Sequence, residues 1–196
     1  MSARLEGETE PKIDLLPGKE SWQPSLLIGQ MVLVSSRSSR GGPNAARKCW
    51  VTMICSDPPM IALGCRLSHR TAINILETRE FVINVPGEEI AARVLAAGDT
   101  VSSHPDPSSG TAWTFIPSSR VAAPRVEECR GHVECVLEAT HRLHGEEVLF
   151  IAQVVAASAD RSLLDGPVSG RYASLRPIFS LEAGLFASLG PARTTD

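Results

Sequence analysis

The chain has 196 residues, of which 43% are hydrophobic, and it carries a formal net charge of -3. A chain of this length can bury one sizeable core, so we expect a single domain. The slight acidic excess leaves no cationic surplus to hold the protein on nucleic acid or on an anionic membrane. The most apolar stretch, residues 148–158, is also far shorter than the roughly 20 residues that a membrane-spanning helix needs.

The two ends of the chain differ in composition from its middle. Residues 1–25 are polar and are punctuated by proline and glycine, which predicts a flexible leader and not a secretory signal. Five cysteines in a chain without an export signal favour reduced thiols, so we expect a cytoplasmic protein. We therefore expect one domain over residues 26–190 and a short tail over residues 191–196.

Taken in chain order, the first half alternates between extended runs and turn-forming residues. The runs 31–36 and 45–54 flank a turn rich in glycine and serine, which predicts a hairpin. Two prolines at 58 and 59 cannot donate backbone hydrogen bonds, so the strand must break there before a third strand over 60–65. The spacing of apolar residues then predicts a helix over 71–79, a strand over 81–86 and a second helix over 88–97.

The second half contains a long loop and another hairpin. Residues 98–120 are dense in Ser, Pro, Gly and Asp, which predicts a surface loop with a short strand at 114–116. Strands are expected over 132–139, 148–157 and 177–181, followed by a glycine-rich tail. Six or seven strands with short connections favour a mainly β, antiparallel barrel with two or more short helices over a parallel βαβ sheet.

Few side chains form a pattern typical of catalysis or metal binding. Cys129, His132 and Cys135 have a C-x2-H-x2-C spacing, but a structural zinc site needs a fourth ligand, so ordinary strand packing is the favoured interpretation. His141 and His144 flank a turn without a nearby nucleophile, which is typical of solvated histidines. No G-x-G-x-x-G motif follows a strand. We predict no catalytic amino acid and no metal.

The region from residue 43 to residue 86 carries an ordered set of short motifs: PNAARKCW, then a DPP turn, then GCRLSHRT, then EFVINVP. Together they resemble the flavin reductase-like, FMN-binding split β-barrel family, and the similarity continues with weaker matches over residues 27–190. The resemblance implies a split β-barrel of antiparallel, Greek-key type that binds FMN.

The resemblance also implies where the flavin lies. The isoalloxazine ring would rest on the tryptophan-bearing strand and the loop that follows it, and the phosphate would lie at the turn before the first helix. Homodimers with the site at the subunit interface are usual in the family, so residues 184–186 would help to close it. The implied FMN-binding residues are Ala46, Arg47, Lys48, Cys49, Trp50, Val51, Thr52 and Cys55 for the ring, and Ser68, His69, Arg70 and Thr71 for the phosphate.

Elementary physics favours an anion at that helix start. A helix that begins near Thr71 presents free N–H groups and the positive end of its dipole, and Arg70 adds a full charge. A simple N-cap by Ser68 or Thr71 is the structural alternative.

The chain departs from the family pattern in two places. Where many members have Asp-Lys-Phe, this chain has Asp106, Pro107 and Ser108, so a cation and an aromatic ring are lost. Conversely, Arg47 and Lys48 occupy a strand that usually carries small or apolar residues. We expect one of these two cations to supply the missing charge to the phosphate, because alternation lets only one face the site.

The function implied by the resemblance is an NAD(P)H-dependent FMN reductase, with NADH or NADPH as co-substrate, that supplies reduced flavin to a partner monooxygenase. The flavin carries the redox chemistry, which agrees with the absence of an evident catalytic side chain. Two alternatives stay open: a flavin- or ligand-binding protein without reductase turnover, and an FMN-dependent oxidase that acts on a small substrate.

Overall fold

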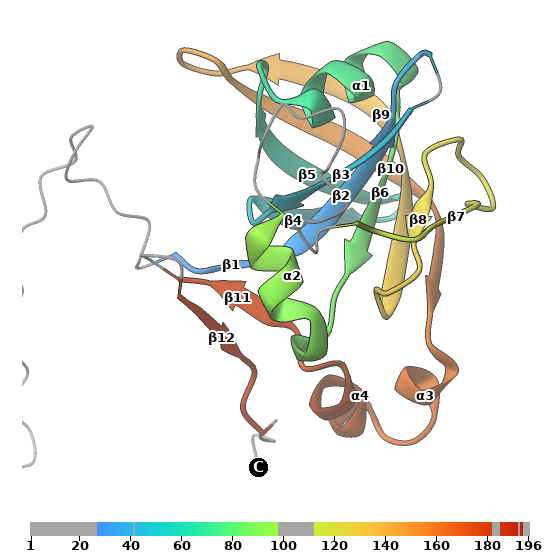
Figure 1. Cartoon of the computed structure of the whole chain (residues 1–196), viewed down its shortest axis with the longest axis vertical. Helices are drawn as coiled ribbons and strands as arrows, with labels where there is room; N and C mark the ends of the chain where they lie inside the picture. The colour runs from blue at the N-terminus through green and yellow to red at the C-terminus, as the bar shows by residue number, and fades with distance from the viewer. Residues whose placement is uncertain (1–26, 41, 98–111, 182–184, 192, 194–196) are drawn as a thin grey trace, which may run out of the picture.

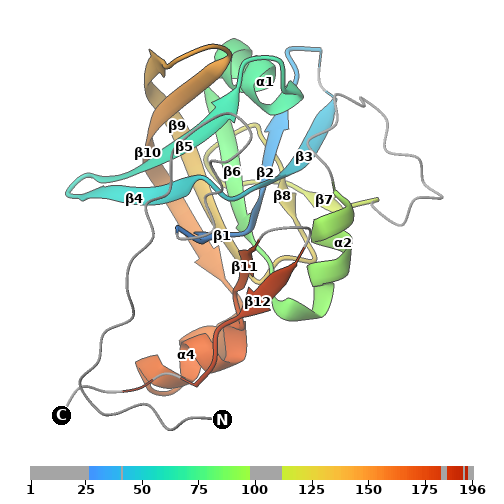
Figure 2. The same cartoon turned by 90° about the vertical axis from the view of Figure 1, so that its left-hand side faces the viewer.

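The computed structural model describes residues 27–40, 42–97, 112–181, 185–191 and 193. Its centre is a curled seven-stranded sheet with the order β3-β2-β6-β9-β10-β5-β4, in which every neighbouring pair is antiparallel (Figures 1 and 2). This arrangement confirms the predicted mainly β, split-barrel fold. Its strands are β2 (Val32–Arg37), β3 (Pro43–Lys48), β4 (Val51–Ser56), β5 (Pro59–Arg66), β6 (Glu80–Val85), β9 (Gly131–Arg142) and β10 (Glu147–Ala159).

The two edge strands of this sheet, β3 and β4, follow each other directly along the chain. The prediction of one continuous strand over 45–54 is therefore wrong, because Lys48 pairs with Val32 of β2 whereas the Trp50 carbonyl accepts a hydrogen bond of 2.8 Å from Gly64 of β5. Cys49 and Trp50 lead the chain from one edge of the sheet to the other. We call these two residues the seam.

A glycine allows another segment to approach the seam closely. A Cβ atom added to Gly29 would lie only 2.1 Å from the carbonyl oxygen of Cys49, a distance that no side chain tolerates. Gly29 belongs to a smaller sheet in which β11 pairs with both β1 and β12. The bounds of its strands are β1 (Gly29–Gln30), β11 (Ile178–Ser180) and β12 (Phe186–Ser188).

The hydrophobic core has a main cluster inside the barrel and a second one outside it. Val32 and Val34 of β2 point inward and join Leu63, Phe81 and other apolar residues of the barrel interior. Residues on the opposite face of β2, among them Leu33, pack under α2 (Ala91–Ala96). Because β2 is buried on both faces, it lacks the polar alternation of a surface strand.

Two predicted helices are present and two further helices were not predicted. Helix α1 (Arg70–Thr78) confirms the first, and a 3-10 turn (Glu88–Ile90) followed by α2 confirms the second. The missed helices are α3 (Arg161–Leu164) and α4 (Val168–Leu175); α4 buries none of its residues, so no apolar periodicity marked it. Strand β12, in the glycine-rich segment after residue 181, was not predicted either.

The long loop after α2 is only partly covered by the structure. Its second part contains β7 (Phe115–Ile116), which agrees with the predicted short strand and pairs with β8 (Arg125–Val126). The predicted leader 1–25, residues 98–111 with the departure at 106–108, and residue 184 lie outside the described residues. Among the helices that are described, none has the length and apolarity to cross a membrane.

Asn84 of the EFVINVP motif joins three strands in the interior. Its side-chain amide donates hydrogen bonds to the Leu33 carbonyl (3.0 Å), the Ser35 hydroxyl (2.8 Å) and, within its own strand, the Val82 carbonyl (3.2 Å). Its side-chain oxygen accepts a hydrogen bond of 2.8 Å from the backbone N–H of Val126 in β8. The fully buried amide is therefore satisfied and connects β2 and β8 to β6.

Candidate functional site

A cavity of about 450 Å³ opens at the seam between β3 and β4. It gathers the end of β3 and the seam, the end of β5, the residue before α1, the first residue of β10 and the last of β11. We call it the seam pocket. Its lining residues are Arg47, Lys48, Cys49, Trp50, Gly64, Cys65, Arg66, His69, Glu147 and Ser180.

The inner part of the seam pocket holds a buried cation beside an imidazole. Lys48 is only 6% exposed, and its ammonium nitrogen lies 3.2 Å from Nδ1 of His69. Because an ammonium group can only donate, Nδ1 of His69 is the acceptor in this contact. The Cys65 sulfur lies 3.8 Å from the same ring nitrogen. A lysine, a histidine and a thiol thus meet on one side of the pocket.

The outer part of the seam pocket carries an ion pair. Nε of Arg66 donates to Oε1 of Glu147 over 2.9 Å. The other carboxylate oxygen of Glu147 is buried, and no hydrogen-bond partner for it exists among the described residues. Cationic side chains outnumber this one carboxylate in the lining, so the pocket favours an anionic ligand.

Arg47 and Lys48 send their charged groups in different directions. The Arg47 guanidinium donates a 3.0 Å hydrogen bond to the Leu95 carbonyl at the end of α2. Lys48 instead lies on the face of β3 that continues the barrel interior, opposite Val32. Both residues contribute to the lining, but the Lys48 ammonium is the charge directed toward His69.

Trp50 forms one wall of the seam pocket because its neighbour on β5 has no side chain. A Cβ atom at Gly64 would lie 3.1 Å from both Cβ and Cε3 of Trp50, so the indole packs directly on the β5 backbone. Trp50 as a whole residue stays 55% exposed. A flat aromatic group of this kind can stack against a planar ligand.

Five of the twelve predicted flavin-binding residues line the seam pocket: Arg47, Lys48, Cys49, Trp50 and His69. The other seven lie outside its lining. Ala46 is buried and Val51 packs against the barrel core. Thr52 is exposed, and Cys55 lies near the tip of the β4–β5 hairpin, where its thiol donates to the Asp57 carbonyl.

Ser68, Arg70 and Thr71 surround the start of α1. The Ser68 hydroxyl donates to Glu146, and the buried Thr71 hydroxyl accepts from Asn44, so neither residue acts as the alternative N-cap. The N-cap position is held by His69, which makes no side-chain capping bond. Nε of Arg70 is buried without a hydrogen-bond partner among the described residues. The start of α1 therefore combines an uncapped end with an unused cationic donor.

Half of the seam pocket could not be identified from the sequence. The missed residues are Gly64, Cys65, Arg66, Glu147 and Ser180. Three of them end β5, and only the pairing of β5 with β4 brings them to the seam. Glu147 reaches the pocket because β10 pairs with β5 in a register that sets it opposite Arg66. In the sequence, the only mark of Glu147 is the turn HGEE over residues 144–147, between the two strands of the second hairpin.

The C-x2-H-x2-C residues pack and form hydrogen bonds, and the described part of the chain has no group of three side chains placed to hold a metal ion. Burial is the main reason that the pKa of Cys129 and that of Cys135 are raised to about 12, so both thiols stay protonated. Nε2 of His132 lies 2.9 Å from the Val126 carbonyl, and the Ser158 hydroxyl lies 3.3 Å from Nδ1. His132 is thus held between β8 and β10. His141 and His144 are exposed at the β9–β10 hairpin, as predicted.

The surroundings of His132 predict a pH dependence of stability. Burial lowers the pKa of His132, and the Arg125 charge acts in the same direction, against the bond to Val126. The folded state therefore binds the proton less well than the unfolded chain, whose histidine has a pKa of about 6.5. The contribution of His132 to the free energy of unfolding is fully present above that pH. It is lost as the pH falls from about 6.5 through the lowered pKa.

Urea unfolding at a series of pH values checks this expectation. The midpoint should be level above about pH 7 and should decline below about pH 6.5, whereas His132→Gln should flatten this decline. The exposed His141→Gln serves as the matched control and should keep the wild-type profile. A profile of His132→Gln that still declines like the wild type would contradict this account.

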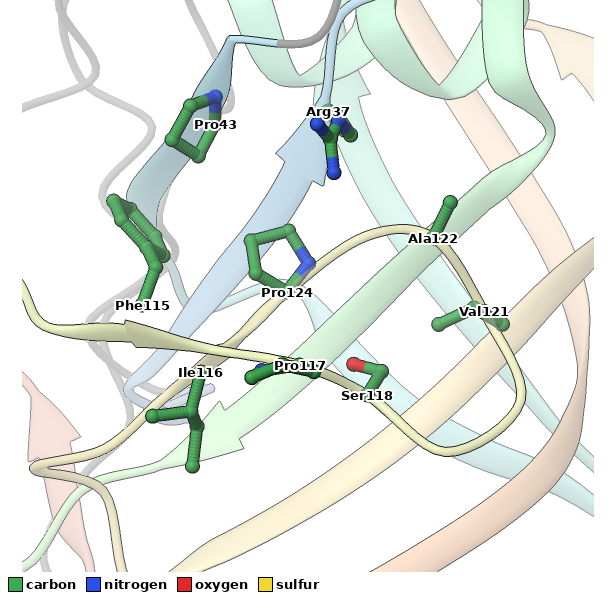
Figure 3. A pocket seen from close by; sticks show the side chains of 9 residues that line it. All are labelled: Arg37, Pro43, Phe115, Ile116, Pro117, Ser118, Val121, Ala122 and Pro124. Atoms are coloured by element: carbon green, nitrogen blue, oxygen red, sulfur yellow. The ribbon is translucent and has the colours of Figure 1, made fainter.

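A second cavity of about 410 Å³ lies where the 115–124 loop passes the β2–β3 hairpin (Figure 3). Prolines and other apolar side chains make up most of its lining, and Arg37 is its one charged residue. No predicted flavin-binding residue lines it. The loop itself is pinned by Glu134, which accepts backbone hydrogen bonds from Ser119 and Arg120.

The fold and the seam pocket define a split-barrel protein with a pocket that favours an anionic ligand. Comparison with known proteins identifies its family. The model of the flavin reductase like domain matches residues 25–176, so the chain belongs to the flavin reductase-like family. The family places the chain among flavin-related oxidoreductases. The family predicted from the motifs is thereby confirmed.

Individual relatives show how similar the chain is to known members. It is 28% identical over 195 residues to the uncharacterized protein YwrF of Bacillus subtilis, covering 90% of this chain and 93% of the relative. Nitrilotriacetate monooxygenase component B of Bacillus cereus superposes with a TM-score of 0.80 at 22% identity, covering 94% of this chain and all of that chain. An FMN-binding protein of Thermus thermophilus, crystallised with p-hydroxybenzaldehyde, has a TM-score of 0.73 at 19% identity, with coverages of 96% and 99%.

Proposed function

We propose that the seam pocket binds FMN and that the protein is an NAD(P)H-dependent flavin reductase. The observation that carries the proposal is the convergence of a buried lysine, an uncapped helix start and an exposed tryptophan at one pocket, in a chain of the flavin reductase-like family. A volume of about 450 Å³ lies within the range of roughly 300–1,000 Å³ that is usual for small-molecule sites.

The residues present fit a phosphorylated flavin. Lys48 and Arg70 supply positive charge close to the start of α1, and the buried Nε of Arg70 still needs an acceptor. A phosphate group offers such an acceptor and is stabilised by the N–H groups of a helix start. Lys48 takes the role that the missing lysine of the family pattern would have had. The predicted set from Ala46 to Cys55 and from Ser68 to Thr71 remains part of this proposal.

The residues of this chain bind the flavin, orient it and exclude water from the pocket. When bound, FMN supplies the ring that accepts a hydride from NADH or NADPH. Trp50 gives that ring a flat wall, and the Gly64 backbone sets the depth of the pocket. The Lys48 ammonium and the imidazole of His69 hold negative charge in place. No side chain needs to act as a nucleophile or as a general acid.

Absorbance spectroscopy tests this function. The full chain should acquire a bound-flavin spectrum on addition of FMN, and the band near the flavin maximum should bleach when NADH or NADPH is added without oxygen. Bound FMN that neither nicotinamide bleaches would instead indicate a flavin-binding protein or an oxidase. A chain that binds no FMN would refute the proposal.

A second copy of the chain is the partner we propose for the open side of the barrel. Strand β4 and the β1–β11–β12 sheet lie on the same side (Figure 2), and exposed apolar residues belong to both elements or adjoin them. Met53 is 71% exposed on β4, and Leu185 is 63% exposed just before β12. An apolar patch of this kind is typical of an interaction surface.

Light scattering coupled to size exclusion measures the mass of the assembly. We expect a homodimer for the wild-type chain and a monomer for Met53→Asp. Leu164→Asp, an equally drastic change at an exposed residue of α3, should leave the dimer intact. A wild-type monomer would refute this assembly.

A flavin-dependent monooxygenase is the further partner we propose, since one structural neighbour is a monooxygenase component.

A further inference from the structure

Two cysteines of the seam pocket, Cys49 and Cys65, lie next to the point where the pairing of β4 with β5 begins. Val51 pairs with Leu63 and Thr52 with Ala62, and Gly64 donates its N–H to the Trp50 carbonyl. The same register, continued beyond this bond, would set Cys49 opposite Cys65. Because the pair of Trp50 and Gly64 is hydrogen bonded, that next pair would occupy the closely spaced position of an antiparallel ladder, where Cα atoms are about 4.5 Å apart.

This spacing suits a covalent link. Disulfides span Cα separations of about 4.4–6.8 Å, and opposing residues of antiparallel strands fall in that range. Cys49 and Cys65 both line the seam pocket, and Cys65 is also part of the main core cluster. Cys49 is half-buried and lies at the seam, where the chain belongs to neither β3 nor β4.

Cys65 lies beside polar side chains of the seam pocket. Its sulfur lies 3.8 Å from Nδ1 of His69, which in turn lies 3.2 Å from the Lys48 ammonium. Cys65 is buried like Cys129 and Cys135, but unlike them it lines the seam pocket.

We propose that Cys49 and Cys65 form a redox-sensitive pair that hydrogen peroxide converts into a disulfide in the wall of the seam pocket. The Cys65 sulfur attacks one peroxide oxygen, an S–O bond forms, the O–O bond breaks, and the departing hydroxide takes the Cys65 thiol proton and leaves as water. The Cys49 sulfur then attacks the resulting sulfenic sulfur, the S–S bond forms, and the released hydroxide takes the Cys49 thiol proton. Two thiols lose two electrons in total, and one peroxide becomes two waters.

The consequence for ligand binding rests on the proposed function. The disulfide draws the Cys65 sulfur away from His69 and fixes the seam to β5, which changes the wall against which the flavin would lie. Reduced flavin that escapes into aerated solution reacts with oxygen and yields hydrogen peroxide. Oxidation of the pair would thus weaken FMN binding when reduced flavin is released without a consumer.

Differential alkylation of the full chain tests the disulfide without any flavin. The reduced protein is treated with an equimolar amount of hydrogen peroxide, blocked with iodoacetamide and analysed by mass spectrometry. Trypsin releases residues 49–66 as one peptide with three cysteines, Cys49, Cys55 and Cys65, because no lysine or arginine lies between Lys48 and Arg66. Chymotryptic cleavage after Trp50 then separates the first cysteine from the others.

We expect Cys49 and Cys65 to become resistant to alkylation together and to recover it with dithiothreitol. Cys55→Ser is the matched control, because Cys55 lies opposite Met60 near the hairpin tip, and it should oxidise like the wild type. Retention of full alkylation at Cys49 and Cys65, or a disulfide that includes Cys55 instead, would overturn the proposal.

Flavin titration separates this proposal from the proposed function. In the wild type, peroxide should weaken FMN binding by about tenfold, reversibly, whereas the dissociation constant of Cys49→Ser, whatever its value before treatment, should not change with peroxide. A disulfide that leaves FMN affinity unchanged would overturn the regulatory half of the proposal. If the reduced chain binds no FMN at all, the proposed function fails, and the alkylation result still decides the fate of the cysteine pair.

Discussion

Replacing Lys48 by methionine is expected to weaken FMN binding by about ten- to a hundredfold, the largest loss of any single charge at the seam pocket. Methionine keeps the length and the apolar stem of lysine but removes the charge. Lys48 is buried against His69, so its ammonium is poorly screened by water and interacts strongly with an anionic ligand. Fluorescence quenching of FMN gives the dissociation constant.

Arg47→Met is the matched control for this prediction. The Arg47 guanidinium is bonded to the Leu95 carbonyl, so its loss should lower stability by roughly 1 kcal/mol and change FMN affinity little. Equal losses of affinity in both variants would mean that the two cations act together. An unchanged dissociation constant in Lys48→Met would remove the charge argument for this site.

Asn84→Ala is expected to lower the free energy of unfolding by about 3 kcal/mol or more. The substitution leaves the N–H of Val126 and the carbonyl of Leu33 without their side-chain partner in a region closed to water. An unsatisfied buried polar group costs about 1–3 kcal/mol, and here more than one is created. Equilibrium unfolding in urea gives the free energy directly.

Asn44→Ala provides the comparison at a second asparagine. Asn44 is half-buried, and its one side-chain hydrogen bond, to Thr71, is long at 3.4 Å. Its loss should cost no more than about 0.5 kcal/mol. If both variants unfolded at the same urea concentration, the interior amide would have no special part in holding β2, β6 and β8 together.

The candidate site shows where local sequence information ends. Alternation along a strand predicted that only one of Arg47 and Lys48 faces the site, whereas both line the seam pocket and only their charged groups diverge. The sequence could not say which charge is directed toward His69, because that depends on the register of β3 against β2. Glu147 was not predicted at all, since it lies 81 residues from Arg66, its partner in the pocket.

The sequence by itself determined the family, the mainly β class and most of the strands, because the ordered motifs and the alternation of apolar residues are local properties that each segment carries on its own. Only the tertiary structure decided that the strand expected over 45–54 divides at Cys49 and Trp50. That break arises because Lys48 pairs with β2 whereas Trp50 bonds to β5, and these two strands lie next to opposite ends of the sheet order. Closing a curled sheet requires such contacts between segments far apart in the chain. The same closure brings β5, β10 and β11 to the seam and thereby creates the pocket.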